Sequence, residues 1–227
     1  MENNFIGIDY SRNSPGICIL EKNSCKWINI FRTSNNIQKM IKKEGTAFNI
    51  LSSSELFLIN IIEKLEFKDL YYKNERNKLL DSIYFSNLVF ESILPYINEK
   101  TIIGMEGVSF GSSGNSLIDI VVSTTLLRAL LIKKINPENF YIISPSAIKK
   151  YAVKGNAKKD ELYHTLLDKR KYDVRLKPLL TVLEENKDAW VKGPKKVENP
   201  CSDIIDATWI SLFLEDNLEK LLAGIKI

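Results

Sequence analysis

Two short apolar runs, almost a hundred residues apart, each end in a carboxylate. Phe5-Ile6-Gly7-Ile8 is followed by Asp9, and Thr101-Ile102-Ile103-Gly104-Met105 is followed by Glu106. Both runs have the length and composition of buried strands. A charge next to a buried strand is costly unless something pairs it. We therefore expect Asp9 and Glu106 at the carboxyl ends of neighbouring central strands and treat them as candidate site residues.

The rest of the chain alternates between strand-like and helix-like patterns. Short β-prone runs at 16–20, 26–31 and 140–143 bring the expected number of strands to five. Helical spacing of apolar residues predicts two helices within 54–98, with a break near 67–74. It also predicts helices at 116–134, from 144 onward, at 157–169 and at 200–222. This order predicts an α/β fold in which helices flank one mixed sheet.

A second pair of acids, Asp203 and Asp206, opens the last predicted helix. The two are three residues apart and therefore share one helix face, and a helix start favours their ionised forms. Four carboxylates at one sheet edge repel one another unless cations neutralise them. Oxygen ligands without His or Cys suit Mg²⁺, for which Mn²⁺ substitutes. Two such ions can drive phosphodiester hydrolysis, so Asp9, Glu106, Asp203 and Asp206 are the predicted catalytic and metal-binding residues.

Composition excludes several other kinds of site. Cys18, Cys25 and Cys201 are too few and too widely spaced for a zinc site or a disulfide framework, so we interpret them as apolar fillers. The only histidine, His164, receives no role. No apolar run is long enough to span a membrane and no signal peptide is visible. We expect a cytoplasmic, nucleoid-associated protein (in the host cytoplasm if it is viral), with an organelle matrix as the alternative.

Positive charge is concentrated in the last third of the chain. The whole chain carries a net charge of +4, whereas residues 149–200 hold 14 Lys/Arg against 8 Asp/Glu. A solvated basic face would explain this excess, and so would a surface that binds nucleic acid. The second reading is favoured because the excess lies in one segment.

Three segments resemble the RuvC family of Holliday junction resolvases, which have a ribonuclease H-like fold. Residues 6–11 (IGIDYS) resemble the family's first strand, residues 103–108 (IGMEGV) the strand with the catalytic Glu, and residues 199–207 (NPCSDIIDA) the closing helix. Each motif is weak alone, but their order is specific. The Lys-, Ile- and Asn-rich composition adds the expectation of a viral, phage or organellar member.

A fourth segment, residues 148–160 (IKKYAVKGNAKKD), is similar to the family's lysine-rich stretch. The resemblance implies that Lys150 and Lys159, with Lys154 and Lys158 nearby, contact phosphates of the cleaved strand; an ordinary basic helix turn is the alternative. The family also tends to carry an aromatic residue soon after its Glu. Phe110 is the nearest counterpart, for which a core or lid role is equally consistent.

The resemblance implies a structure-selective endonuclease that resolves four-way DNA junctions as a homodimer. The chain departs from the family in two places, which predict one domain over 1–227 with a helical insertion at about 33–100 and a basic insertion at about 170–199. These departures leave open a broader nuclease for flaps or forks. An actin-like ATPase and a catalytically silent DNA-binding module are the remaining alternatives, although neither explains the four acids.

Overall fold

The computed structural model describes residues 3–11, 13–53, 57–63, 70–108, 115–191 and 196–225. Their centre is a mixed sheet of six strands in the order β4-β3-β2-β1-β5-β6. The strands are β1 (Phe5–Asp9), β2 (Gly16–Leu20), β3 (Cys25–Arg32), β4 (Phe57–Ile62), β5 (Ile102–Glu106) and β6 (Phe140–Ile143). The first three form an antiparallel meander, whereas β5 runs parallel to β1, β6 to β5 and β4 to β3.

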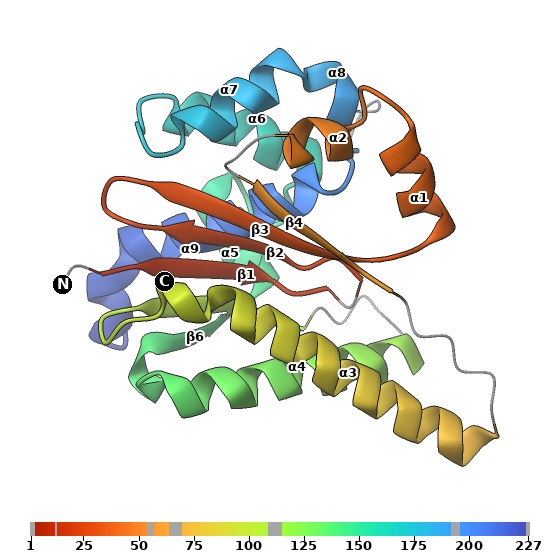
Figure 1. The fold of residues 1–227 in the computed structure, drawn as a ribbon. Coiled ribbons are helices and arrows are strands. Elements are labelled where there is room, and N and C mark those ends of the chain that lie inside the picture. Colours follow the sequence, from red (N-terminus) through yellow and green to blue (C-terminus); the bar gives the residue numbers. More distant parts are fainter. Residues whose placement is uncertain are drawn as a thin grey trace.

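Helices cover both faces of this sheet (Figure 1). The longer helices are α3 (Tyr71–Ile93), α4 (Asn115–Lys134), α6 (Lys159–Arg170) and α9 (Cys201–Leu222). The shorter ones are α1 (Asn35–Lys42), α2 (Ala47–Ser52), α5 (Pro145–Ala152), α7 (Lys177–Glu185) and α8 (Lys187–Trp190). None of the helices in the described part of the chain is both long and apolar enough to cross a lipid bilayer.

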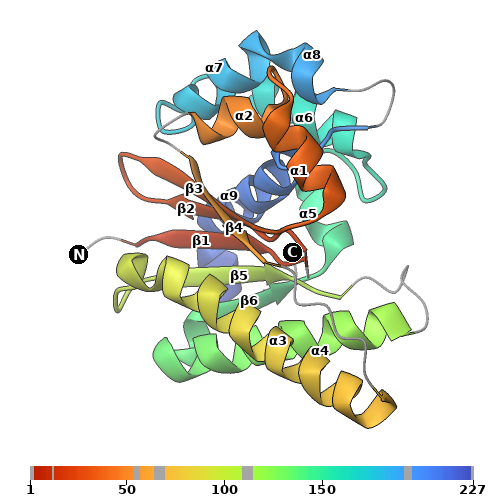
Figure 2. The ribbon, with the colours of Figure 1, turned by 45° about the vertical axis from the view of Figure 1, so that its right-hand side comes forward.

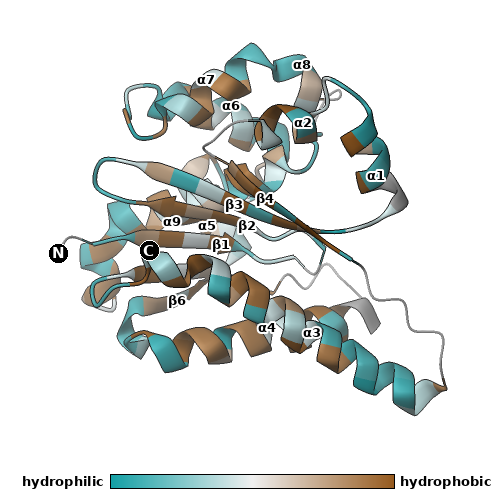
Figure 3. Ribbon diagram, in the orientation of Figure 1, coloured by the Kyte–Doolittle hydropathy of each residue, from teal (hydrophilic) through white to brown (hydrophobic). Residues whose placement is uncertain are grey.

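The two faces of the sheet have separate hydrophobic cores because side chains alternate along each strand. Ile6 and Ile8 of β1 pack with residues of α3 and α4, whereas Phe5 lies in the core that also contains α9, α6 and α7. Figure 2 shows α3 and α4 together on one side of the sheet and α9 on the other. The strands are hydrophobic along most of their length, while the helices alternate between hydrophobic and hydrophilic residues (Figure 3). The predicted α/β class, one mixed sheet flanked by helices, is therefore confirmed.

The prediction of five strands is wrong, because β4 occupies a segment that the sequence pattern placed in a helix. The spacing of Ile59 and Ile62 looked helical, but Phe57–Ile62 is a short apolar run that pairs with β3 along its full length. The rings of Trp27 and Phe57 stack with centroids 5.2 Å apart. Cross-strand packing of this kind favours the extended backbone. Only the second of the two helices expected there is present, as α3.

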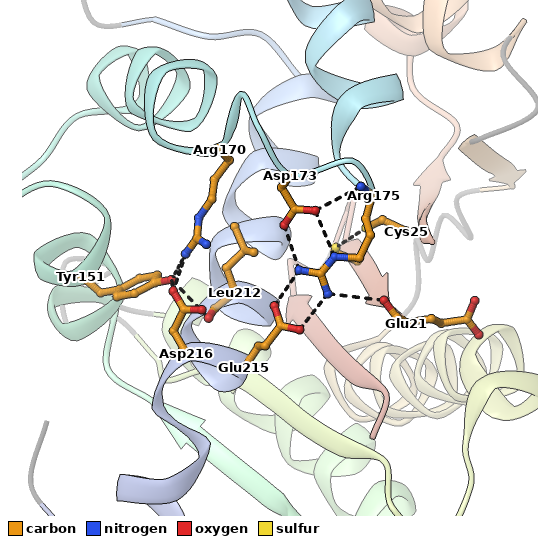
Figure 4. A network of polar contacts seen from close by, with 10 residues as sticks. Glu21, Cys25, Tyr151, Arg170, Asp173, Arg175, Leu212, Glu215 and Asp216 are labelled. Carbon is orange, nitrogen blue, oxygen red and sulfur yellow. Dashed lines mark hydrogen bonds and ion pairs between the residues drawn. The ribbon is translucent and has the colours of Figure 1, made fainter. Parts of the chain in front are cut away.

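The segment 170–199, predicted to be basic and irregular, contains the helices α7 and α8. Arg175, in the connection between α6 and α7, attaches this segment to α9 (Figure 4). Its guanidinium donates to Glu215 Oε1 and Oε2 over 2.7 and 2.8 Å, and to Asp173 over 2.8 and 3.0 Å. Arg170 and Tyr151 both donate to Asp216, one residue further along α9. These ion pairs fix α6 relative to α9 and so position the start of α6 at the sheet edge.

We predict that Arg175→Met destabilises the fold by about 2–3 kcal/mol, because two carboxylates in a partly buried position lose their shared donor. Chemical denaturation gives this free energy directly. The matched control is Arg76→Met on the exposed side of α3, for which we expect a change within about 0.5 kcal/mol. Equal effects of the two substitutions would contradict the anchoring role of Arg175.

A candidate carboxylate active site

Asp9 and Glu106 lie side by side at the carboxyl ends of two central strands of the sheet. They are the last residues of β1 and β5, two parallel neighbours in which Ile8 is paired with Met105. The apolar residues before each acid hold the strand in the core, so each carboxylate stands where the core ends. Both side chains line a cavity of about 420 Å³. The strand-end placement expected from the sequence is what the structure shows.

Helix α9 brings Asp206 to the same cavity and Asp203 beside it, because two glycines let the helix lie against the strands. A Cβ at Gly7 would stand 2.3 Å from the carbonyl oxygen of Ala207, and a Cβ at Gly16 would stand 2.3 Å from that of Asp203. Any side chain at either position would therefore push the helix away. The first turn of α9 thus depends on Gly7 and Gly16 for its position near Asp9.

Asp203 is held by a closed ring of hydrogen bonds. Ser14 Oγ donates to its Oδ2 over 3.0 Å, and Ser202 Oγ lies 3.3 Å from its Oδ1. Asn199 completes the ring, since its Nδ2 donates to Ser14 Oγ over 3.2 Å and its Oδ1 accepts from Ser202 Oγ over 2.5 Å. The sequence analysis assigned no role to Ser14 or Asn199. The turn-like composition of 11–15 was visible, but its approach to residue 203 is a tertiary contact.

Lys159 provides the closest positive charge in this site. Its Nζ lies 2.7 Å from Asp206 Oδ2, and both residues line the cavity together with Lys158. Lys158 directly precedes α6, and Lys159 is the first residue of this helix. Because α6 begins next to the carboxylates, both lysines that were predicted to contact phosphates lie near the acids. We find the geometry suitable for holding an anionic group above the carboxylates.

The other residues predicted to bind DNA lie elsewhere. Lys150 is exposed on α5 and does not line the cavity, whereas its neighbour Lys149 does. The rotation of α5 about its axis explains why Lys149 lines the cavity and Lys150 does not. Ile148 is buried in the core, and Lys149, the next residue, lies at the border of that buried face. Lys154 is paired with Glu161 at 2.6 Å. Phe110 lies outside the described residues.

Burial and mutual repulsion raise the pKa of three of the acids. Burial, followed by the charges of Asp206 and Asp203, holds the pKa of Asp9 well above its usual range. Burial and Asp206 raise the pKa of Glu106 to about 7, although Lys149 and Lys159 act in the opposite direction. Burial also raises the pKa of Asp203 to about 7 against the influence of Lys159.

Lys159 responds in the complementary way. Burial opposes its charged form, but the carboxylates of Asp206, Asp9 and Asp203 outweigh burial and raise its pKa above the usual lysine value. The ammonium group therefore stays protonated across the physiological range. Three lysines, Lys149, Lys158 and Lys159, line the cavity with the acids Asp9, Glu106 and Asp206, and Asp203 lies beside them, so the acids of the site outnumber its lysines by one.

The donor set fits a hard divalent cation in its chemistry. It consists of carboxylate oxygens without nitrogen or sulfur ligands, and a bound cation would reduce the electrostatic repulsion between these acids. Within the described ranges, no three acidic, histidine or cysteine side chains already converge as a metal-binding group.

Comparisons with known proteins bear on the fold. No protein-family model and no curated protein matches the chain. Among solved structures, RuvC of Thermus thermophilus is similar, with a TM-score of 0.48 and 13% identity over 94% of each chain. RuvC of the same organism in complex with a Holliday junction substrate has a TM-score of 0.48 and 10% identity over 95% of this chain and 96% of the other.

The raised pKa values predict that protons and divalent cations compete for the site. Carboxyls with folded pKa values near 7 and unfolded values near 4 hold more protons when folded. The cluster therefore lowers the free energy of unfolding as pH rises from about 4 through 7. We expect Mg²⁺ to raise the thermal unfolding midpoint clearly at pH 8 and little at pH 5.5. Thermal unfolding with Mg²⁺ or EDTA tests this, and an equal Mg²⁺ effect at both pH values would contradict it.

Proposed function

We propose that this protein is a metal-dependent endonuclease that cuts branched DNA, with four-way junctions as its preferred substrate. The observation that carries the proposal is the gathering of Asp9, Glu106 and Asp206 around one cavity with Lys158 and Lys159 at its rim. Asp203 adjoins them through the first turn of α9. Metal-dependent phosphodiester hydrolysis uses carboxylates that bind divalent cations and positive charges that stabilise the phosphate. The cavity brings residues of both kinds together.

In the proposed reaction each group has one task. Asp9, Glu106, Asp203 and Asp206 would hold two Mg²⁺ ions, which when bound supply Lewis acidity and lower the pKa of an attacking water. Lys159 would hold a non-bridging phosphate oxygen of the cleaved strand and offset the charge that develops on it. The ring of Ser14, Ser202 and Asn199 keeps the Asp203 carboxylate oriented during this step.

The preference for branched DNA is supported by the motif order of the sequence, which resembles junction resolvases. A nuclease of the same fold that cuts flaps or forks is the alternative substrate class. Cleavage of matched four-way, Y-shaped and linear DNA with Mg²⁺ separates the two. We expect the four-way junction to be cut fastest, and equal cutting of linear duplex would rule out resolvase activity.

We predict that Asp9→Asn and Glu106→Gln each lower the rate of cleavage by about 100-fold or more, because each removes a charge that metal binding requires. DNA binding should persist or tighten, since one repulsive charge is gone. The matched control is Glu99→Gln, on the exposed segment before the other end of β5, which should cleave at the normal rate. Normal cleavage by both site variants would show that the acids are not the active site.

The outward side of α4 supports the expectation of a homodimer. Six of its exposed positions, 118, 121, 122, 125, 129 and 132, recur at helical spacing and are uncharged, whereas the exposed Lys133 and Lys134 follow at the end of the helix. Ile118 is 61% exposed, Val121 42% and Ile132 43%. The residues of this helix that enter the core include Leu127 and Leu131, on the opposite side from these positions. An uncharged exposed stripe on a helix is typical of an interface, and two symmetric nicks require two sites.

We expect the protein to be dimeric at micromolar concentration and the double substitution Ile118→Glu, Val122→Glu to make it monomeric, because both charges would face each other across a two-fold axis. Light scattering after size exclusion measures the mass. Tyr172→Glu is the control, because this residue is 85% exposed in the connection between α6 and α7. A monomeric wild-type protein would contradict the dimer.

A further inference from the structure

Two cavities adjoin the carboxylate site on the side of α1 and open around Asn199. One, of about 220 Å³, lies between the end of β3 and Asn199, with Ser14 and Ser34 among its lining residues. The other, of about 430 Å³, has Lys39 on one wall and Lys196 on the opposite segment. We call the two together the α1 groove. It is formed by three stretches of chain that are distant in sequence: 13–14, 31–40 and 196–199.

The α1 groove carries positive charge without compensation. Within the described part of the chain, neither Lys39 nor Lys196 has an ion-pair partner. Both are exposed, and α1 itself contains basic residues and no acid. Among the described residues that line the groove, Glu198 is the one acid, and Arg32 is paired with Asp81, so Lys39 and Lys196 face a single anion. Groups that repel one another across a groove favour an anion between them.

The groove is continuous with the site through hydrogen bonds. Asn199, which lines both cavities, donates to Ser14, and Ser14 donates to Asp203. The carboxyl end of β3, which lines the groove, lies at the same end of the sheet as Asp9, because Asp9 pairs with Gly16 and Gly16 with Asn29. A polymer whose phosphate lies at the carboxylates could therefore reach the α1 groove with its next phosphates. The lining near Asn199 includes the uncharged polar residues Asn13, Thr33 and Ser34, which suit a sugar–phosphate backbone.

We infer that the α1 groove binds the backbone of the DNA strand beside the phosphate that is cut, with Lys39 and Lys196 each contacting a phosphate. This inference rests on the proposed function, because the carboxylate site fixes where the strand begins. An acidic peptide would also satisfy the two lysines. The nucleic-acid strand is favoured because the groove lies at the same end of the sheet as a site suited to a phosphodiester.

Binding measured in EDTA tests the groove without any need for cleavage. Each phosphate contact contributes about 0.7 to 0.9 to the slope of log K against log salt, so Lys39→Gln with Lys196→Gln should lower the slope by about 1.4 to 1.8. Affinity for a labelled four-way junction should fall about 10-fold or more at 0.1 M salt. The matched control, Lys100→Gln with Lys134→Gln, changes two exposed lysines away from the groove. An unchanged slope, or an equal loss in the control, would overturn the inference.

A crosslinking experiment locates the strand. All three native cysteines are buried, so Lys39→Cys provides a single exposed thiol. In an Asp9→Asn background, this thiol should form a disulfide with thiol-modified nucleotides within a few positions on one side of the cut, as mapped with the wild-type enzyme. Crosslinks spread evenly along the strand, or the same pattern from Lys100→Cys, would overturn the inference.

The two experiments also separate the inference from the function on which it rests. Failure of wild-type protein to cut any DNA would remove the proposed function, whatever the slope. Normal cutting together with an unchanged slope would remove the groove alone. Competition by a polyglutamate peptide as effective as DNA, with no positional crosslinks, would assign the groove to an acidic protein segment and overturn the strand assignment.

Discussion

The close contact between α9 and β1 is the constraint on which the site depends. A helix normally stands off a sheet by the length of its side chains, but Gly7 allows the backbone of Ala207 to rest directly on the strand. Gly16 does the same beneath Asp203. Because α9 also carries Glu215 and Asp216, which hold the α6–α7 segment, this one contact sets the positions of the acids and, through α6, of Lys159.

The electrostatics of the site follow from this arrangement. Burial and repulsion raise the pKa values of Glu106 and Asp203 to about 7. Both side chains therefore keep their protons to a higher pH than isolated carboxyls, which lose theirs near pH 4. Holding buried carboxylates close together costs free energy, which a nearby opposite charge can offset. Lys159 offsets part of it, and a divalent cation would offset the rest, which links the energetics of the fold to the proposed chemistry.

The sequence predicted those parts of the molecule that depend on local patterns. Strand-end acids, the helix that begins near Pro200 and the alternation of strands and helices were all visible in short windows. The strand β4 was not, because a run of six residues with five apolar ones fits either period, and only pairing with β3 decides between them. Lys149 was missed for a similar reason: the rotation of α5 about its axis is set by its packing on the core. The ring around Asp203 joins Ser14 to Asn199, which is 185 positions away, and to Asp203, which is 189 positions away. No local pattern in the sequence predicts such contacts.

The two segments expected to be insertions meet at the same edge of the sheet. Residues 31–40 form one wall of the α1 groove, and the end of the 170–199 segment, with Asn199, forms the other. Asn199 also holds Ser14, which donates to Asp203, so anything that moves the groove wall would act on the carboxylate. In a nuclease this coupling would make metal binding sensitive to the strand in the groove. For the proposed function, the two predicted insertions are therefore the parts of the chain where we expect substrate selectivity to lie.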